Sequence, residues 1–171
     1  DILYIYPPEM YVSEVESVHY TKDFLLEADP ISLDIPSFIE KFEADNHITF
    51  GEAQKEAIQL SFFEKFSLIT GGPGTGKTTI IKALVKGFQL GGLGRIILCA
   101  PTGRAAKRLT EATEFEATTI HRLLVPVQGS DSYDFTKNED DPLDIDVIII
   151  DEASMLNVRL FYSLMAAIPK E

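Results

Sequence analysis

The sequence contains one cysteine, Cys99, so no disulfide can form within the chain. Cys99 lies in the apolar run RIILCA, and we expect it to be a small buried side chain of a strand rather than a reactive thiol. No apolar run reaches the ~18 to 20 residues that a membrane-spanning helix needs, and the first ten residues lack the basic leader of a secretory signal. We therefore expect a cytoplasmic protein with no membrane partner.

Basic residues are also scarce. The sequence has 15 Lys and Arg residues and 27 Asp and Glu residues, which gives a net charge of −12. This balance argues against a chain that binds nucleic acid over its whole surface. The charge is spread unevenly: residues 95–110 hold basic residues and no acid, whereas residues 126–152 hold many acids and a single lysine, Lys137. The first stretch is a candidate phosphate-binding patch, and within the second, residues 126–146 are either a functional arm or only a solvated loop.

The length of 171 residues is enough for one sizeable domain with a short appendage. We divide the chain at residue 46. Residues 1–46 are interpreted as a mainly helical segment or linker without evident chemistry, in which Pro36 is well placed to begin a helix. The first residue is Asp1 rather than Met, which we interpret as a fragment boundary. The patterns that carry chemistry all lie in residues 47–171.

Residues 71–79, GGPGTGKTT, fit the phosphate-binding loop pattern Gly-x-x-x-x-Gly-Lys-[Ser/Thr]. An apolar stretch at 66–70 before the loop predicts a strand, and an amphipathic stretch at 78–90 after it predicts a helix. In this context backbone N–H groups turn inward on phosphate oxygens. Lys77 would reach the β and γ phosphates, and the Thr78 hydroxyl would bind Mg²⁺. We favour nucleotide binding over a glycine-rich turn that only joins a strand to a helix, because the match is complete.

Two further apolar runs, at 95–100 and 147–150, predict strands that alternate with helices. The helices are expected at residues 52–63, 78–90, 104–112, 118–124 and 155–168. In the first of them, the spacing predicts a buried face made of Ala53, Ala57, Leu60 and Phe63. Three strands separated by helices predict an α/β fold of the P-loop NTPase kind, with a parallel sheet covered by helices on both faces. The phosphate site would lie at the carboxyl ends of the strands.

Asp151 and Glu152 directly follow the run VIII, which places them at the same sheet edge as the phosphate loop. An acid at a strand tip can hold the Mg²⁺ that Thr78 also binds, and a neighbouring carboxylate can orient or deprotonate the attacking water. We assign Asp151 to the metal and Glu152 to the water. The alternative is that one of them only caps the helix that begins near Ser154.

The basic stretch APTGRAAKRL, residues 100–109, follows the strand predicted at 95–100. Its backbone and cations could hold an extended phosphodiester strand, or they could be ordinary surface charges on a helix, and periodicity alone does not decide between the two. His121, in TTIHRLL, is by itself more often a hydrogen-bonded structural histidine than a ligand or a catalyst.

In order along the chain, GGPGTGKTT, APTGRAAKRL, TTIHRLL and DVIIIDEASML resemble helicase motifs I, Ia, Ib and II of superfamily 1B. The likeness is to RecD-type helicases, the family of the exodeoxyribonuclease V alpha subunit. Upstream, Phe50 and Gln54 resemble the adenine-recognising Q motif. The resemblance implies that residues 47–171 are a RecA-like motor domain 1A, which moves 5′ to 3′ along single-stranded DNA and unwinds duplex DNA. It also implies a setting in recombination or repair, with nuclease or other recombination subunits as candidate partners.

The resemblance implies roles for individual residues as well. ATP would be held by Gln54, Gly72, Pro73, Gly74, Thr75, Gly76, Lys77, Thr78 and Thr79. Lys77, Asp151 and Glu152 would be catalytic, with Thr78 and Asp151 at the Mg²⁺ ion. DNA would contact Pro101, Thr102, Gly103, Arg104, Thr119 and His121.

After Ile168 the sequence departs from the family pattern, because neither the glutamine-bearing motif III nor a second motor domain follows. That domain would supply an arginine for the transferred phosphoryl group, so we expect this stretch to bind Mg-ATP weakly and to hydrolyse it poorly. Two other interpretations stay open. One is a P-loop ATPase of the AAA+ kind that acts on proteins or clamps, a function that would not require the APTGRAA and TIHRLL stretches. The other is a nucleotide-dependent scaffold without activity.

Overall fold

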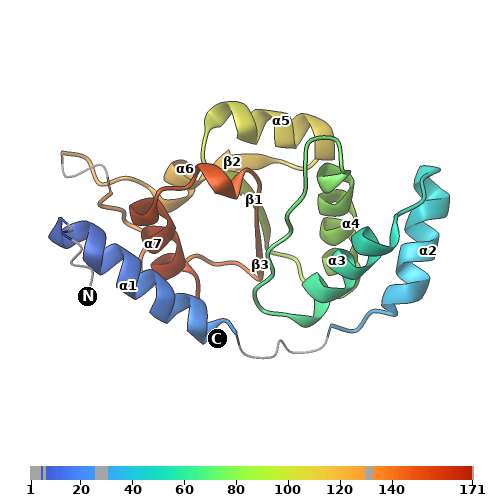
Figure 1. The fold of residues 1–171 in the computed structure, drawn as a ribbon, viewed down its shortest axis with the longest axis horizontal. Helices are drawn as coiled ribbons and strands as arrows, with labels where there is room; N and C mark the ends of the chain where they lie inside the picture. Colours follow the sequence, from blue (N-terminus) through green and yellow to red (C-terminus); the bar gives the residue numbers. More distant parts are fainter. Residues whose placement is uncertain (1–4, 6, 26–30, 130–132, 171) are drawn as a thin grey trace.

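The computed structural model describes residues 5, 7–25, 31–129 and 133–170 (Figure 1). Its helices are α1 (Pro8–Asp23), α2 (Ile35–Asn46), α3 (Glu52–Phe63), α4 (Lys77–Leu90), α5 (Gly103–Thr113), α6 (Ile120–Leu124) and α7 (Val158–Ala167), with a 3₁₀ turn, η1, at Ala153–Met155. The strands are β1 (Ile96–Ala100), β2 (Ala117–Thr119) and β3 (Val147–Ile150). Among the described helices, none has the length and apolar content to cross a lipid bilayer.

The three strands form one parallel sheet in the order β2-β1-β3. Leu98 of β1 lies between Ala117 of β2 and Ile149 of β3. The hydrogen bonding continues just past β3, where Asp151 N donates to Cys99 O at 2.9 Å. All three strands therefore end at the same edge of the sheet, and the predicted α/β fold with a parallel sheet is confirmed.

Alternation along β1 divides its side chains between two layers of helices. Ile96 and Leu98 pack in a cluster with side chains of α4 and α5, whereas Ile97 and Cys99 pack in a cluster with side chains of α6 and α7. Cys99 is fully buried, and burial raises the pKa of its thiol to about 12, so it is a packing side chain as expected. Helices cover both faces of the sheet, as predicted from the sequence.

One strand prediction and the start of one helix prediction are wrong. Residues 66–70 lead to the phosphate loop without joining the sheet, and β2 occupies positions where the sequence predicted the start of a helix. Leu68 in the first stretch is 73% exposed, so its apolar character reflects no burial in a sheet. β2 has three residues, too few for an alternating pattern to be visible, and it is a strand only because it pairs with β1.

Helix α3 has the predicted bounds but buries a different face. Ile58 and Phe62 are buried, while Leu60 and Phe63 of the predicted face are 48% and 59% exposed. Phe62 takes the inner position because Gly87 of α4 leaves room for its ring, where a Cβ on Gly87 would lie 2.3 Å from Phe62 Cζ. Residue spacing within α3 cannot reveal this, since the deciding feature belongs to another helix.

Helix α2 packs into the core that α3 and α4 share. It begins after Asp34, whose carboxylate accepts from Ser37 N at 3.4 Å, with Pro36 in its first turn as predicted. Phe38 and Phe42 on its inner face are buried. Phe42 stacks on Phe50, which lies just before α3, so the start of α3 is held against α2.

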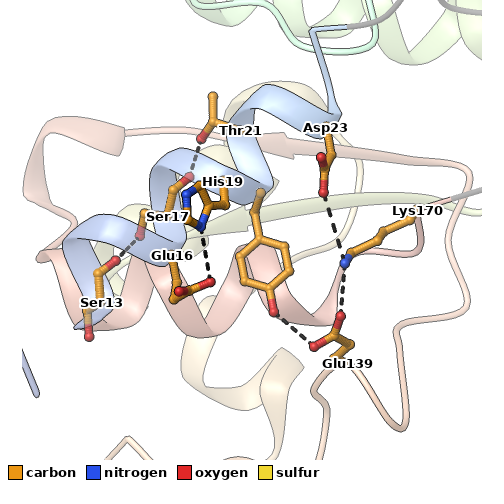
Figure 2. Close-up of polar contacts among 9 residues, drawn as sticks. Ser13, Glu16, Ser17, His19, Thr21, Asp23, Glu139 and Lys170 are labelled. Atoms are coloured by element: carbon orange, nitrogen blue, oxygen red, sulfur yellow. Dashed lines mark hydrogen bonds and ion pairs between the residues drawn. The ribbon is translucent and has the colours of Figure 1, made fainter.

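Helix α1 lies along α7 at the other side of the molecule (Figure 1). Its buried residues are Ser13, Ser17 and Tyr20, and Ser13, Ser17 and the half-buried Thr21 lie at intervals of four residues (Figure 2). The hydroxyl of each of the last three donates to the backbone carbonyl four residues earlier. Because the hydroxyls find partners within the helix, α1 approaches α7 closely without leaving polar groups unpaired.

The acidic segment, residues 126–146, is anchored in the core. Phe135 and Leu143 are buried, and an antiparallel bridge joins Pro126 to Phe135. Glu139 accepts from Tyr20 OH at 3.1 Å and from Lys170 Nζ at 2.9 Å (Figure 2). The segment is therefore a hairpin-like arm with one buried side, within which residues 130–132 lie outside the described part.

Candidate nucleotide-binding site

The phosphate loop depends on two glycines with left-handed backbone. Gly74 and Gly76 have φ of 73° and 82°, a region that glycine adopts without steric cost. Gly76 directly precedes α4, so its conformation turns the chain into the helix at Lys77. The first N–H groups of α4 therefore point toward the loop, where they favour an anion.

A pocket lies between the phosphate loop and the end of β3. Its lining residues are Pro73, Gly74, Thr75, Gly76, Lys77, Thr78, Asp151 and Glu152. The fold thus brings the two acids together with the lysine and threonine of the loop, although they are far apart in the sequence. Hydroxyl and carboxylate oxygens are ligands that Mg²⁺ prefers, so Thr78 and Asp151 fit this ion, while the glycine-lined loop fits a triphosphate.

Lys77 reaches back across the loop. Its Nζ donates to the carbonyls of Gly71 and Gly72 at 2.7 and 2.8 Å, and Thr75 Oγ1 donates to the same Gly72 carbonyl at 2.8 Å. Thr79 lies in the first turn of α4 and is half-buried. The ammonium group is therefore held inside the curve of the loop, where phosphate oxygens can take the place of its carbonyl acceptors.

Glu152 has a left-handed backbone conformation, with φ 55° and ψ 38°. For a residue other than glycine this costs about 1 kcal/mol or more. Its side chain makes no capping hydrogen bond to η1, and α7 is capped instead by Asn157, whose Oδ1 accepts from Leu160 N at 2.9 Å. These contacts do not support the alternative that Glu152 only caps a helix, and Glu152 lines the pocket.

Gln54 contacts the loop without lining the pocket. Its Nε2 donates to the Thr75 carbonyl at 2.9 Å, and its Oε1 accepts from Gly51 N at 2.7 Å. Phe50, the other residue of the Q-like pattern, is 4% exposed and stacks on the ring of Phe42. Both residues are therefore engaged with other parts of the protein. The contact with Thr75 was not predicted, because a backbone acceptor leaves no signature in the sequence.

Two candidate DNA contacts lie at the same sheet edge, which is the upper end of the sheet in Figure 1: Thr102 follows β1, and Thr119 is the last residue of β2. Thr102 Oγ1 accepts from Ala105 N and caps α5, and Thr119 Oγ1 accepts from Arg122 N and caps α6, both at 3.2 Å. Both hydroxyls therefore already accept a hydrogen bond from a backbone N–H in the first turn of the following helix.

The remaining candidates differ in how far they reach the surface. Gly103 and Arg104 are exposed, Pro101 is half-buried, and His121 is half-buried with its ring against an aromatic ring of the acidic segment, 5.7 Å between centroids. Arg122, an exposed cation next to His121, was missed, although its charge within TTIHRLL was an available signal. None of these residues lines the pocket.

A protein-family model described as an AAA domain matches residues 54–171. The chain is 42% identical over 118 residues to the ATP-dependent RecD2 DNA helicase of Deinococcus radiodurans. It is 36% identical over 139 residues to the RecBCD enzyme subunit RecD of Mycolicibacterium smegmatis, and 41% identical over 127 residues to the ATP-dependent DNA helicase dda of Enterobacteria phage T4. These alignments cover 69%, 68% and 69% of this chain but only 16%, 25% and 29% of the relatives. The chain therefore spans less than a third of the length of each of these relatives.

Proposed function

Because the chain belongs to the AAA domain family and is similar to RecD-type helicases, we propose that it is the ATP-hydrolysing part of a DNA helicase motor. The observation that carries the proposal is the pocket that joins Lys77 and Thr78 of the phosphate loop to Asp151 and Glu152 after β3. A cation, a hydroxyl and two carboxylates around a glycine-lined loop are the groups that phosphoryl transfer needs.

Each of these side chains has a distinct task in the proposed reaction. Lys77 and the N-terminus of α4 bind the phosphate oxygens, and Thr78 and Asp151 hold the Mg²⁺ ion, which neutralises phosphate charge when bound. Glu152 orients the attacking water and accepts its proton while a bond forms from water oxygen to the γ phosphorus. The bond from that phosphorus to the β-phosphate oxygen breaks, and ADP leaves.

The proposed DNA track runs over the carboxyl ends of β1 and β2 and the segments after them, with single-stranded DNA as the ligand. It consists of Pro101, Thr102, Gly103, Arg104, Thr119 and His121, to which Arg122 is added. The exposed Arg104 contacts phosphate, whereas Thr102 and Thr119 act in part by fixing the helix starts beside it. Contacts of this kind position the strand and do not read its sequence.

The finer assignments rest on the resemblance to RecD-type helicases. We assign residues 47–171 to a RecA-like motor domain 1A and residues 1–46 to the segment that precedes it. Translocation runs 5′ to 3′ with unwinding of duplex DNA, in the cytoplasm, alongside nuclease or other recombination subunits. The names of the relatives, which are DNA helicases and a RecBCD subunit, favour this function over an AAA+ ATPase acting on proteins or clamps and over an inactive scaffold.

Binding of Mg-ATP to the chain, measured by calorimetry, tests the proposal. Lys77→Ala should weaken binding on the order of 100-fold, because the triphosphate loses its charged partner. Lys65→Ala, which removes an exposed lysine before the loop, should leave the affinity unchanged. Equal affinities for the two variants would show that the pocket is not the nucleotide site.

The rate of ATP hydrolysis distinguishes the proposed ATPase from an inactive scaffold. Glu152→Gln should keep Mg-ATP binding and lower the ATPase rate by about 10² or more, because the water loses its proton acceptor. Glu40→Gln, an exposed acid on α2, is the matched control. An ATPase rate that does not respond to Glu152→Gln would favour the scaffold.

A further inference from the structure

The side chain of Thr75 connects the two halves of the phosphate loop. Its Oγ1 donates to the carbonyl of Gly72 at 2.8 Å, which closes the turn that contains the left-handed Gly74. Its own backbone carbonyl accepts from Gln54 Nε2 at 2.9 Å. Thr75 is therefore held by α3 through its backbone, and it holds the first half of the loop through its hydroxyl.

The first glycine of the loop makes room for this side chain. Gly71 does not have the left-handed backbone of Gly74 and Gly76, so its φ alone does not call for glycine. A Cβ on Gly71 would, however, lie 2.7 Å from Thr75 Oγ1, which is closer than side-chain atoms approach one another. The glycine at this position therefore leaves the space in which the Thr75 hydroxyl reaches Gly72.

The Gly72 carbonyl also accepts from Lys77 Nζ, at 2.8 Å. A carbonyl oxygen has two lone pairs, so it can accept from both donors at once. In the proposed binding reaction Lys77 turns to the phosphates, and its hydrogen bonds to the loop carbonyls are then lost. The hydrogen bond from Thr75 does not involve the ammonium group, so it can keep the turn closed when Lys77 leaves.

From these contacts we infer that Thr75 is a positioning residue, whose hydroxyl keeps the loop in the curved form that receives a triphosphate while Lys77 moves to the phosphate oxygens. The inference rests on the proposed nucleotide-binding function and adds a side chain with a task of its own. A loop that is already curved loses less conformational entropy when the ligand binds, which raises the affinity. Because the contact concerns the loop, it should affect every triphosphate ligand alike.

Two changes at Thr75 and one control test the inference. Thr75→Val removes the hydroxyl and keeps the branched shape of the side chain, whereas Thr75→Ser keeps the hydroxyl. Thr136→Val makes the same change at an exposed threonine of the acidic segment. Affinities for Mg-ATP and Mg-tripolyphosphate are measured by calorimetry, and thermal unfolding is recorded. NMR relaxation gives the order parameters of the Gly72, Gly74 and Gly76 N–H groups in the unliganded chain.

We expect Thr75→Val to weaken the binding of both ligands by a similar factor of about three to ten, as loss of one net hydrogen bond does. The order parameters of the three loop glycines should fall in this variant without any ligand, because the turn is no longer closed. Thr75→Ser should match the unaltered chain in both measurements, and so should Thr136→Val.

Three results would overturn the inference alone. Weaker binding by Thr75→Val with unchanged order in the unliganded loop would show that the hydroxyl contacts the phosphates directly. Equal losses in Thr75→Val and Thr75→Ser would show that the hydroxyl is not the group that matters. Unchanged affinities in Thr75→Val, whatever its unfolding temperature, would show that the contact does not prepare the loop for binding. If the unaltered chain binds neither ligand, the proposed function itself fails, and the inference fails with it.

Discussion

The ring of Phe62 in α3 meets the ring of Phe88 in α4 edge-on, with centroids 4.8 Å apart and planes at 72°. Helix α4 begins at the phosphate loop, and α3 carries Gln54, which contacts that loop. Packing between the two helices therefore sets the position from which Gln54 reaches Thr75. The face that α3 buries matters for the site as well as for the core.

The two adjacent phenylalanines of α3 should respond very differently to truncation. Phe62 is 2% exposed, so Phe62→Ala should lower the free energy of unfolding by about 3 to 5 kcal/mol through lost burial and a cavity. Phe63 is 59% exposed, and Phe63→Ala should change it by about 0.5 kcal/mol or less. Urea denaturation of both variants measures the difference, and similar losses would mean that α3 is rotated relative to the structure.

Glu152 should carry a conformational cost that glycine removes. Because φ is 55° there, Glu152→Gly should raise the free energy of unfolding by about 1 kcal/mol relative to Glu152→Gln. Both variants lack the proposed proton acceptor, so both should lose ATPase activity. Chemical denaturation compares their stabilities, and a glycine variant no more stable than the glutamine variant would argue against the left-handed backbone.

Asp146 should make the fold sensitive to acid. Its carboxylate accepts from the Arg95 side chain and from the N–H groups of Arg95 and Gly94, and these hydrogen bonds, the side-chain one foremost, lower its pKa from 3.8 to about 2. Because the pKa in the folded chain lies below the unfolded one, this contribution to stability is present above about pH 4 and is lost as pH falls from there through 2. In Asp146→Asn it should be missing. Denaturation midpoints measured from pH 2 to pH 7 test this, with Asp45→Asn at an exposed position as control. An identical pH dependence in Asp146→Asn and the unaltered chain would contradict it.

Thr119 should act first as a helix cap. Thr119→Ala removes the acceptor for Arg122 N and should destabilise the fold by about 1 kcal/mol, whereas Thr119→Ser keeps the hydroxyl and most of the stability. Binding of fluorescent single-stranded DNA then separates capping from direct contact. If capping is the main role, Thr119→Ser binds DNA like the unaltered chain; loss of binding in this stable variant would instead show a direct contact through the threonine side chain.

The parts of the fold that were predictable depend on local features. The amphipathic spacing at 78–90 predicted a helix, and in α4 the side chains of Ile80, Ile81, Leu84, Val85 and Phe88 are all buried. The buried face of α3 was mispredicted because Gly87 on another helix decides it, and the strand at 66–70 was mispredicted because a strand needs a partner as well as apolar residues. The resemblance to RecD-type helicases, drawn from four motifs, is confirmed by the relatives.

In the candidate site, too, some arrangements could be predicted from the sequence and others could not. The meeting of Lys77 and Thr78 with Asp151 and Glu152 was predicted from the sequence. Only the two acids follow a strand of the sheet, because residues 66–70 before the loop do not join it. The contact of Gln54 with the loop could not be derived, since its acceptor is a backbone carbonyl. Thr119 is both the last residue of β2 and the cap of α6, and the short strand could not be predicted because it depends on pairing with β1.

The strand order also bears on how the chain folds. β1 and β2 are joined by one short helix, whereas Arg95 and Asp146, at the starts of β1 and β3, are 51 positions apart. Closing a longer loop costs more chain entropy, so β3 should join the sheet after β1 and β2 have paired. Asp151 and Glu152 arrive with β3, and the ability to bind Mg-ATP should therefore appear during refolding only after most of the helical signal has formed.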